Sequence, residues 1–255
     1  MKILVIPDSH AQPGVSNERF DWVGRCIVKE RPDLVIDIGD SADMGSLCKY
    51  DVGTVSAEGR RYHEDLAVYW DANARIFAPV RKLQNRMIAN KKKMYNPRFV
   101  KCHGNHEARI DRAAKETPSL YGHLSYKDLR EEEYGWEVYK YLQPFTTNGI
   151  TFQHCFTSGV MGRPIGGENL AASIVKKGYC SCVQGHSHIL DYWEDRAAHG
   201  GKVFGLSVGS YFDHEMDYTS EQGRWWSGLV MLHGVENGYA TPEFIPYEEV
   251  RKRYG

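Results

Sequence analysis

Two motifs in this sequence place metal-binding side chains two residues apart. Asp8 and His10 form the first motif. His186 and His188 repeat the spacing much later in the chain. In an extended segment, side chains two residues apart project to the same side, so each motif can present two ligand atoms to one ion. Carboxylate and imidazole groups together suit a borderline divalent cation such as Mn, Fe, Zn or Co. The two motifs therefore predict a metal site, although either one alone arises often by chance.

Two further polar clusters follow apolar runs. Asp40 comes after the run Leu34–Ile38 and Gly39, where a buried strand is expected to end. The segment Gly104–Glu107, which reads Gly-Asn-His-Glu, directly follows a predicted strand at Arg98–Cys102. In α/β sheets, ligands bind at the carboxyl ends of the strands. We therefore expect the other polar clusters to converge on Asp40.

The polar motifs occur in a definite order, each after an apolar run: Asp-x-His, Gly-Asp, Gly-Asn-His-Glu, an isolated histidine on a strand, and Gly-His-x-His. This ordered pattern, which extends from Asp8 to His188, resembles the calcineurin-like metallophosphoesterases. The resemblance implies a metal-dependent phosphoric ester hydrolase that holds two divalent cations. Manganese is the first expectation for these cations, and Fe, Zn, Ni, Co and Mg are the alternatives.

The resemblance also implies which side chains bind the two cations. The expected ligands are Asp8, His10 and His188 for one cation, Asn105, His154 and His186 for the other, and Asp40 as the bridge between them. The bridge must be an anionic carboxylate, because neutral ligands alone would leave two like charges unscreened. Two cations about 3.5–4 Å apart can deprotonate a shared water and clamp the phosphoryl oxygens during in-line attack. Asn105 supplies an uncharged carbonyl oxygen and is also expected to contact the substrate.

His106 and Asp43 are the expected catalytic residues. By resemblance, His106 is not a metal ligand; it stabilises the charge on the phosphorane-like transition state or protonates the leaving oxygen, and an imidazole suits both tasks near neutral pH. The alternative for His106 is a cap on the helix that follows the third strand. Asp43 completes the pattern Gly-Asp-x-x-Asp and is expected to hydrogen-bond His106 and orient it. An Asx turn in a loop is the alternative for Asp43.

The family's isolated strand histidine is expected at His154. Only His123 and His154 lie between the Gly-Asn-His and Gly-His-x-His motifs. Gly149–His154 has the alternation of a strand, with Ile150, Phe152 and His154 on one face. His123 lies in polar, helix-prone sequence, so His154 is favoured.

Met44 limits the choice of substrate. In the protein-phosphatase branch of the family, an arginine occupies the position after the second aspartate of Gly-Asp-x-x-Asp, whereas this sequence has Met44. A phosphoserine or phosphothreonine phosphatase is therefore disfavoured, and a phosphodiester in a nucleotide or nucleic acid is the expected substrate. A phosphomonoesterase is the first alternative, and a binding scaffold without activity is the second. Arg163, in the glycine-rich segment 158–167, is a candidate contact for the substrate phosphate.

The elements that must position these residues begin with a β-α-β unit. A first strand is expected at residues 2–7, a helix ends before Pro32, and Asp33–Asp37 forms the second strand, which implies parallel pairing with a right-handed crossover. Glu64–Lys93 has apolar residues at helical spacing. Pro79 lies inside that run and is expected to break or kink the helix.

The second half of the sequence is rich in short strands. They are expected at residues 137–141, 149–154, 180–184, 190–194, 202–208, 225–233 and 239–245, with a helix at 168–177 capped by Gly178. Early βα units and a late run of strands predict an α/β fold of two packed mixed β-sheets flanked by helices. In the family that the sequence resembles, this is a four-layer αββα sandwich. One domain is expected over residues 1–255, with helical inserts near 44–97 and 107–148.

Composition is that of an ordinary globular protein. The chain has 255 residues, of which 42% are hydrophobic and 25% charged. The net charge of −1 gives no general attraction to nucleic acid or to an anionic membrane. No apolar run approaches the roughly 20 residues of a membrane span, and the six cysteines show no disulfide framework. These features predict a cytoplasmic protein with reduced thiols that acts away from membranes, and the resemblance adds a phosphate ester as its substrate; neither indicates an oligomeric state.

Overall fold

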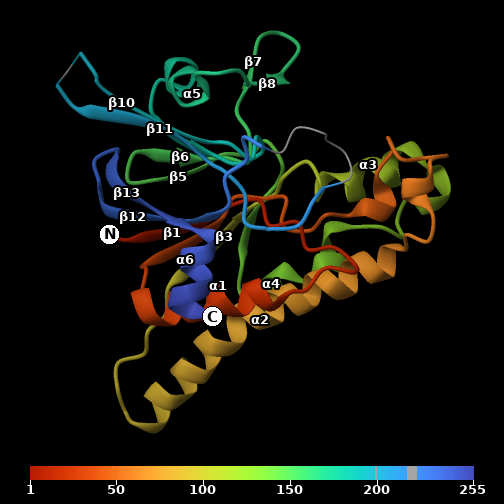
Figure 1. The fold of residues 1–255 in the computed structure, drawn as a ribbon, viewed down its shortest axis with the longest axis horizontal. Helices are drawn as coiled ribbons and strands as arrows, with labels where there is room; N and C mark the ends of the chain where they lie inside the picture. Colours follow the sequence, from red (N-terminus) through yellow and green to blue (C-terminus); the bar gives the residue numbers. More distant parts are fainter. Residues whose placement is uncertain (199, 217–222) are drawn as a thin grey trace.

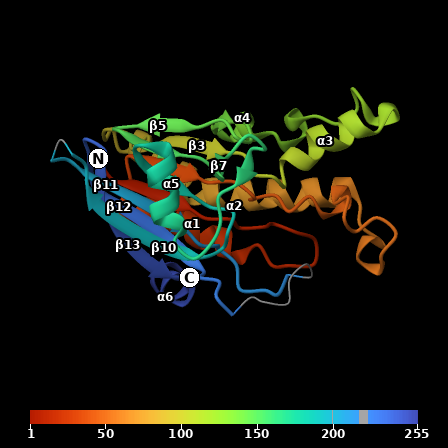
Figure 2. The same ribbon diagram turned by 90° about the horizontal axis from the view of Figure 1, so that it is seen from above.

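The computed structural model describes residues 1–198, 200–216 and 223–255. Two β-sheets lie face to face between outer layers of helix (Figures 1 and 2). The first sheet has six strands in the order β13-β12-β1-β2-β3-β4, in which β1 to β4 are parallel and β12 runs antiparallel to both neighbours. Its strands are β1 (Ile3–Ile6), β2 (Leu34–Asp37), β3 (Arg98–Cys102), β4 (Glu137–Tyr139), β12 (Gly228–Glu236) and β13 (Tyr239–Pro246).

The second sheet has five strands in the order β10-β11-β9-β6-β5. The central strands β6, β9 and β11 are parallel, and the edge strands are antiparallel to their neighbours. The strands are β5 (Phe145–Thr147), β6 (Ile150–Phe152), β9 (Ser181–Gln184), β10 (Leu190–Arg196) and β11 (Lys202–Val208). A separate hairpin, β7 (Thr157–Ser158) and β8 (Arg163–Pro164), projects from this layer (Figure 1).

Helices cover both outer faces. The six-stranded sheet is covered by α1 (Glu18–Glu30), α2 (Tyr62–Ala89) and α6 (Tyr247–Tyr254), and the five-stranded sheet by α5 (Leu170–Gly178) (Figure 1). Buried apolar side chains such as Val5, Ile36 and Val183 fill the space between the sheets. Two shorter helices, α3 (Ala108–Glu116) and α4 (Glu131–Tyr134), follow β3. The predicted fold of two packed mixed sheets flanked by helices is confirmed.

The helix α2 differs from its prediction because it continues through Pro79 without interruption. The missing N–H removes a single hydrogen bond, whereas the buried face around Pro79, which includes Ile76 and Val80, packs against α1. Gly24 of α1 allows this close approach, since a Cβ there would lie 2.5 Å from the carbonyl oxygen of Ile76 and 2.9 Å from the Pro79 ring. Packing of the two helices therefore outweighs the local cost of the proline.

Other boundaries also differ from the expectations. Helix α5 includes Gly178, and the left-handed residue that ends it is Tyr179, with φ 55°. Gly178 is required for packing instead, because a Cβ there would lie 2.7 Å from the Cys182 sulfur. The strand expected at 225–233 begins at Gly228, while β5 and α6 were not predicted.

The two segments predicted as helical inserts contribute to the layers of the sandwich. Residues 44–97 contain α2, which packs along α1. Residues 107–148 contain α3 and α4 and also β4 and β5, which complete the edges of the two sheets. None of the helices in the described residues is long and apolar enough to span a membrane. All six cysteines are free, and four of them are buried.

Candidate metal centre

The expected metal ligands all follow the carboxyl ends of parallel strands. Asp8 and His10 come after β1, Asp40 after β2 and Asn105 after β3. His154 follows β6, and His186 and His188 follow β9 in the facing sheet. Parallel strands deliver their carboxyl ends to the same edge of a sheet, and the two sheets face each other. The loops from both sheets therefore meet at one end of the sandwich.

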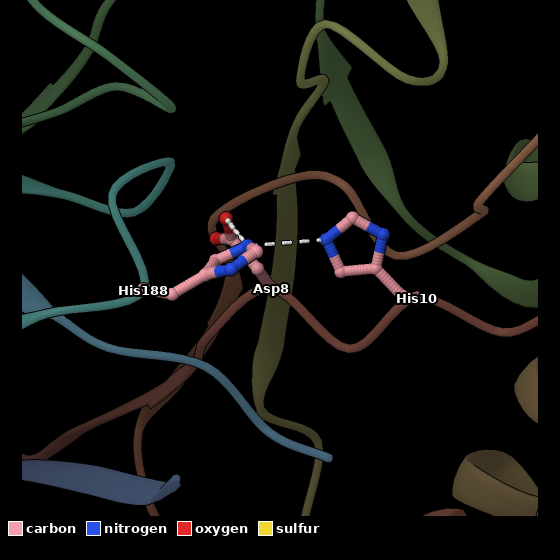
Figure 3. Close-up of side chains that lie close together, drawn as sticks. All are labelled: Asp8, His10 and His188. Carbon is pink, nitrogen blue, oxygen red and sulfur yellow. Dashed lines mark hydrogen bonds and ion pairs between the residues drawn. The ribbon is translucent and has the colours of Figure 1, made fainter. Parts of the chain in front are cut away.

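Asp8, His10 and His188 form the first group of this centre (Figure 3). Nε2 of His188 lies 3.2 Å from Nε2 of His10 and 3.3 Å from Oδ2 of Asp8. Two imidazole nitrogens bound to one tetrahedral cation at about 2.0–2.1 Å are about 3.3 Å apart, so the observed spacing fits a shared ion. Oδ1 of Asp8 is buried without a hydrogen-bond partner among the described residues. An orphaned carboxylate oxygen beside two imidazoles fits a cation site.

Asn105, His154 and His186 form the second group. Oδ1 of Asn105 lies 2.9 Å from Nδ1 of His186 and 3.1 Å from Nε2 of His154. His154 lies two residues beyond the end of β6 and not within a strand as expected. Its Nδ1 lies 3.0 Å from the carbonyl oxygen of Ile38, which turns Nε2 toward the centre. His123, the rejected alternative, is exposed on a turn after α3.

Asp40 lies between the two groups. Its Oδ2 is 3.2 Å from Nε2 of His154, and its carboxylate also lies close to His10 and His106. Burial lowers the pKa of His154, but Asp40 and Asp8 outweigh this effect and raise the pKa to about 10. The two carboxylates therefore create a site that favours positive charge. Asp40 is placed as a bridging ligand would be, and its role as the bridge stays a prediction.

The glycines in the sequence motifs are explained by the position of the carboxylates. A Cβ at Gly104 would lie 2.1 Å from Oδ1 of Asp40, and a Cβ at Gly185 would lie 2.1 Å from Oδ1 of Asp8. Any larger residue at either position would displace a carboxylate that faces the centre. Gly104 and Gly185 therefore allow the carboxylates of Asp40 and Asp8 to lie close to the backbone of the neighbouring loops.

The backbone is strained at several of the expected ligands. Positive φ angles occur at His10 (42°), Asp40 (49°), His186 (68°) and His188 (56°). Residues other than glycine adopt this conformation at a cost of about 1–3 kcal/mol, and such residues cluster at functional sites. The strained backbone directs these side chains toward one point, and this supports a functional role for the cluster.

His106 and Asp43 are in direct contact. Nδ1 of His106 lies 2.8 Å from the carbonyl oxygen and 3.1 Å from Oδ1 of Asp43. Oδ1 of Asp43 is also 3.0 Å from Nδ1 of His10. Burial raises the pKa of Asp43, but these histidines outweigh it and hold that pKa well below its usual value. Burial lowers the pKa of His106, whereas Asp40 and Asp43 raise it, so that it lies above its usual value.

The comparison with known proteins identifies the family. The family model of the calcineurin-like phosphoesterases matches residues 1–244. The chain belongs to the calcineurin-like phosphoesterases. A structure of the phosphoesterase Yfce from E. coli is similar at a TM-score of 0.41 and 13% identity, over 96% of this chain and 100% of that chain. A second solved structure has a TM-score of 0.36 at 12% identity and covers 95% of this chain and 98% of its own. No curated protein sequence matches this chain.

Membership in a metal-dependent family agrees with the chemistry of the donor set. The two groups around Asp40 offer carboxylate and imidazole atoms, which are ligands of borderline divalent cations, and the amide oxygen of Asn105 lies beside two of the imidazoles. This calcineurin-like phosphoesterase therefore has a candidate centre for metal ions at the carboxyl ends of its strands.

Glu107 is a supporting residue of the phosphoesterase that received no role from the sequence. Its buried carboxylate accepts hydrogen bonds from the backbone N–H groups of Asp40 (3.0 Å), Ala42 (2.9 Å) and Gly104 (2.8 Å). The hydroxyl of Ser41 adds a fourth contact at 3.3 Å. Glu107 thereby ties together the loops that carry Asp40 and Asn105. The signal in the sequence was an acidic residue directly after the Gly-Asn-His motif.

A buried ion pair lies beneath these loops and was also missed. Nζ of Lys101 lies 2.9 Å from Oδ2 of Asp37 and donates to the Ser41 hydroxyl at 2.8 Å. Lys101 and Asp37 are paired neighbours on β3 and β2, so an opposite-charge pair in parallel strands was the available signal. Burial raises the pKa of Asp37, although Lys101 opposes that effect.

A cavity of about 400 Å³ opens beside the metal centre. Asn105, His106 and Asp43 line one side of it, and Arg60 and Arg109 add positive charge. Arg163 does not line this cavity. It is exposed on β8, and no hydrogen bond or ion pair joins it to the metal centre among the described residues. Its role in substrate binding stays a prediction without a contact to support it.

Proposed function

We propose that this protein is a dinuclear metal-dependent phosphoesterase that hydrolyses a phosphodiester in a nucleotide or nucleic acid. The observation that carries the proposal is the convergence of the two ligand groups on Asp40. Asp8, His10 and His188 would hold one cation, and Asn105, His154 and His186 the other. Manganese is the proposed metal. The chemistry that two divalent cations supply at such a site is Lewis-acid activation of water and of the phosphoryl oxygens.

His106 is the proposed proton donor or hydrogen-bond donor to the reacting group. Its Nδ1 is held by Asp43, so the ring has one orientation and its Nε2 lies on the side of Asp40, 3.8 Å from Oδ2. His106 also lines the cavity in which a substrate can lie. A proton at Nε2 is thus directed toward the place where negative charge develops on the substrate. Asp43 acts through His106 and is a positioning residue in this proposal.

Met44 supports a diester over a monoester substrate. The side chain of Met44 is fully buried, with an exposed fraction of 0%, and packs in an apolar cluster with Ala42 and Tyr69. No guanidinium from this position reaches the cavity to hold the terminal oxygens of a monoester. A phosphomonoesterase is the second candidate within the enzyme class, and a non-catalytic scaffold is the third.

The test compares two synthetic substrates on metal-stripped protein to which Mn, Ni, Mg or Zn is added back. We expect metal-dependent hydrolysis of bis-p-nitrophenyl phosphate, with Mn the most effective, at a higher kcat/KM than that of p-nitrophenyl phosphate. A preference for the monoester would overturn the choice of substrate. No metal-dependent turnover of either compound would overturn the enzyme itself. His106→Ala from the same purification controls for contaminating hydrolases, because its turnover is expected to fall.

A further inference from the structure

Arg109 lies at the edge of the metal centre, on the first turn of α3. Its Nη1 donates to the carbonyl oxygen of Asp43 at 2.9 Å, and to that of Met44 at 3.3 Å. Its Nη2 lies 3.1 Å from Nε2 of His106. These contacts hold the guanidinium between Nε2 of His106 and the carbonyl oxygen of Asp43, which also contacts Nδ1 of the same ring. Arg109 thus lies next to the nitrogen that the proposed function directs at the substrate.

Among the described residues, no carboxylate forms an ion pair with Arg109. The other two cations of α3 each have a carboxylate one helical turn away, with Lys115 at 2.6 Å from Asp111 and Arg112 at 4.0 Å from Glu116. Arg109 is half-buried. Within the described residues, its guanidinium contacts two carbonyl oxygens and one imidazole. A half-buried guanidinium without a carboxylate favours an anionic ligand.

The cavity that Arg109 lines has room for more than one phosphate. Its volume of about 400 Å³ is within the range of sites that hold whole small molecules. Both carboxylates on its wall are already engaged, Asp51 with Arg60 at 2.6 Å and Asp43 with His10 and His106. The side chain that brings an uncompensated charge to this wall, within the described residues, is Arg109. Tyr50 on the same wall offers an aromatic face.

We propose that Arg109 binds a second phosphate of the substrate, on the side of the cavity beyond His106. The substrate class is then a phosphodiester with a further phosphate next to the scissile one, as in an oligonucleotide end. This inference rests on the proposed function, because the scissile phosphate is assigned to the metal centre. The guanidinium has N–H groups beyond those that donate to the carbonyl oxygens of Asp43 and Met44, and a phosphate can accept from them in a bidentate arrangement.

The experiment compares hydrolysis of the dinucleotide dTpdT with that of the same dinucleotide carrying a terminal phosphate at its 5′ or its 3′ end. We expect one of the two phosphorylated forms to have a kcat/KM about 10-fold or more above that of dTpdT, the scale of a charge-assisted hydrogen bond. Arg109→Gln is expected to reduce this ratio to about 1, and Arg109→Lys to retain part of it. The ratio is internal to each variant, so it is unaffected by the fraction of protein that is folded.

Arg112→Gln is the matched control, because Arg112 is on the next turn of α3 but does not line the cavity. It is expected to keep the wild-type ratio. A ratio that is the same in Arg109→Gln and wild type, or a wild type that does not discriminate, would overturn the inference. An equal loss for all substrates, including bis-p-nitrophenyl phosphate, would assign Arg109 to the scissile phosphate or to the support of His106 and overturn the inference as well.

A binding measurement separates this inference from the proposed function. Thymidine 3′,5′-bisphosphate and the two thymidine monophosphates are titrated calorimetrically into the manganese-loaded protein. The bisphosphate is expected to bind about 10-fold more tightly than either monophosphate, and this advantage should vanish in Arg109→Gln. If bis-p-nitrophenyl phosphate is not hydrolysed, the proposed function fails, and the titration still decides the second phosphate site. Equal affinities in wild type would contradict that site.

Discussion

Glu107→Gln is expected to loosen the two loops that form the metal centre. The carboxylate of Glu107 accepts from Asp40 and Gly104 through Oε2, and from Ala42 and Ser41 through Oε1. A glutamine has one oxygen and one NH₂ group in the same place. Its oxygen can satisfy the two N–H groups on the Oε2 side. The NH₂ group then faces the N–H of Ala42, which is left without an acceptor, while the Ser41 hydroxyl can accept from the amide.

The magnitude follows from that single orphaned N–H. A buried donor without a partner costs about 1–3 kcal/mol, so Glu107→Gln is expected to lower the free energy of unfolding by about 2 kcal/mol. Glu107→Ala orphans three backbone N–H groups and leaves a cavity, so it should cost at least about twice as much. Because the affected N–H groups belong to the loops of Asp40 and Asn105, both cations are also expected to bind more weakly to Glu107→Gln.

The assay is equilibrium unfolding in urea, with calorimetric titration of Mn²⁺ into the stripped protein. The urea midpoint should fall without a change of slope, since the surface exposed on unfolding is the same. Glu116→Gln is the control, because Glu116 is on the same helix but is largely exposed, and its loss is expected within about 0.5 kcal/mol. Wild-type stability and metal affinity in Glu107→Gln would refute the role assigned to this carboxylate.

Two further predictions concern His106 and His103. His106→Ala should keep both cations and reduce turnover about 10²-fold or more, the usual scale for a general acid; metal analysis and initial rates check this, and an unchanged rate would remove His106 from the reaction. His103 lies 2.6 Å from Glu131. Burial lowers the pKa of His103, but the carboxylate of Glu131 outweighs burial and raises this pKa above its usual value. Burial raises the pKa of Glu131, but His103 and Lys101 outweigh burial and lower this pKa below its usual value. In the unfolded state the pKa of Glu131 is about 4.5 and the pKa of His103 is about 6.5, and between these two values the pair stabilises the folded state fully. The stabilisation is lost as the pH rises through the folded-state pKa of His103. It is also lost as the pH falls through the folded-state pKa of Glu131. In urea unfolding with EDTA, the loss of stability in His103→Gln should be largest near about pH 6 and shrink toward about pH 9, and a loss that grows with pH would contradict the assignment.

The position of the candidate metal centre could be predicted from the sequence because its determinants are local. Each expected ligand lies within a few residues of an apolar strand, and the glycines before Asn105 and His186 mark where a carboxylate of another loop approaches. Polar residues directly after buried strands in a parallel sheet gather at one edge whatever the rest of the fold does. The local pattern was therefore sufficient to bring these residues together.

Arg109 and Glu107 could not be assigned in this way, because their contacts depend on how loops distant in sequence pack. Glu107 meets Asp40 only when β2 and β3 are paired, and Arg109 meets the carbonyl of Asp43 only when α3 lies across the loop after β2. Pro79 fails as a helix breaker for the same reason, since packing against α1 decides the outcome. For α6 the signal was present, as Tyr247, Val250 and Tyr254 lie on one helical face, but charged neighbours obscured it.

The central claim is that Asp40 is shared by two cations, and metal stoichiometry tests it most directly. Wild type and Asp40→Asn are stripped, loaded with Mn²⁺ and desalted, and the bound metal is measured by mass spectrometry against protein concentration. Two ions per chain are expected in wild type, because two ligand groups meet at Asp40. In Asp40→Asn the occupancy of both sites should fall, since the amide no longer screens the two like charges. Two tightly bound ions in Asp40→Asn would show that Asp40 is not the bridge.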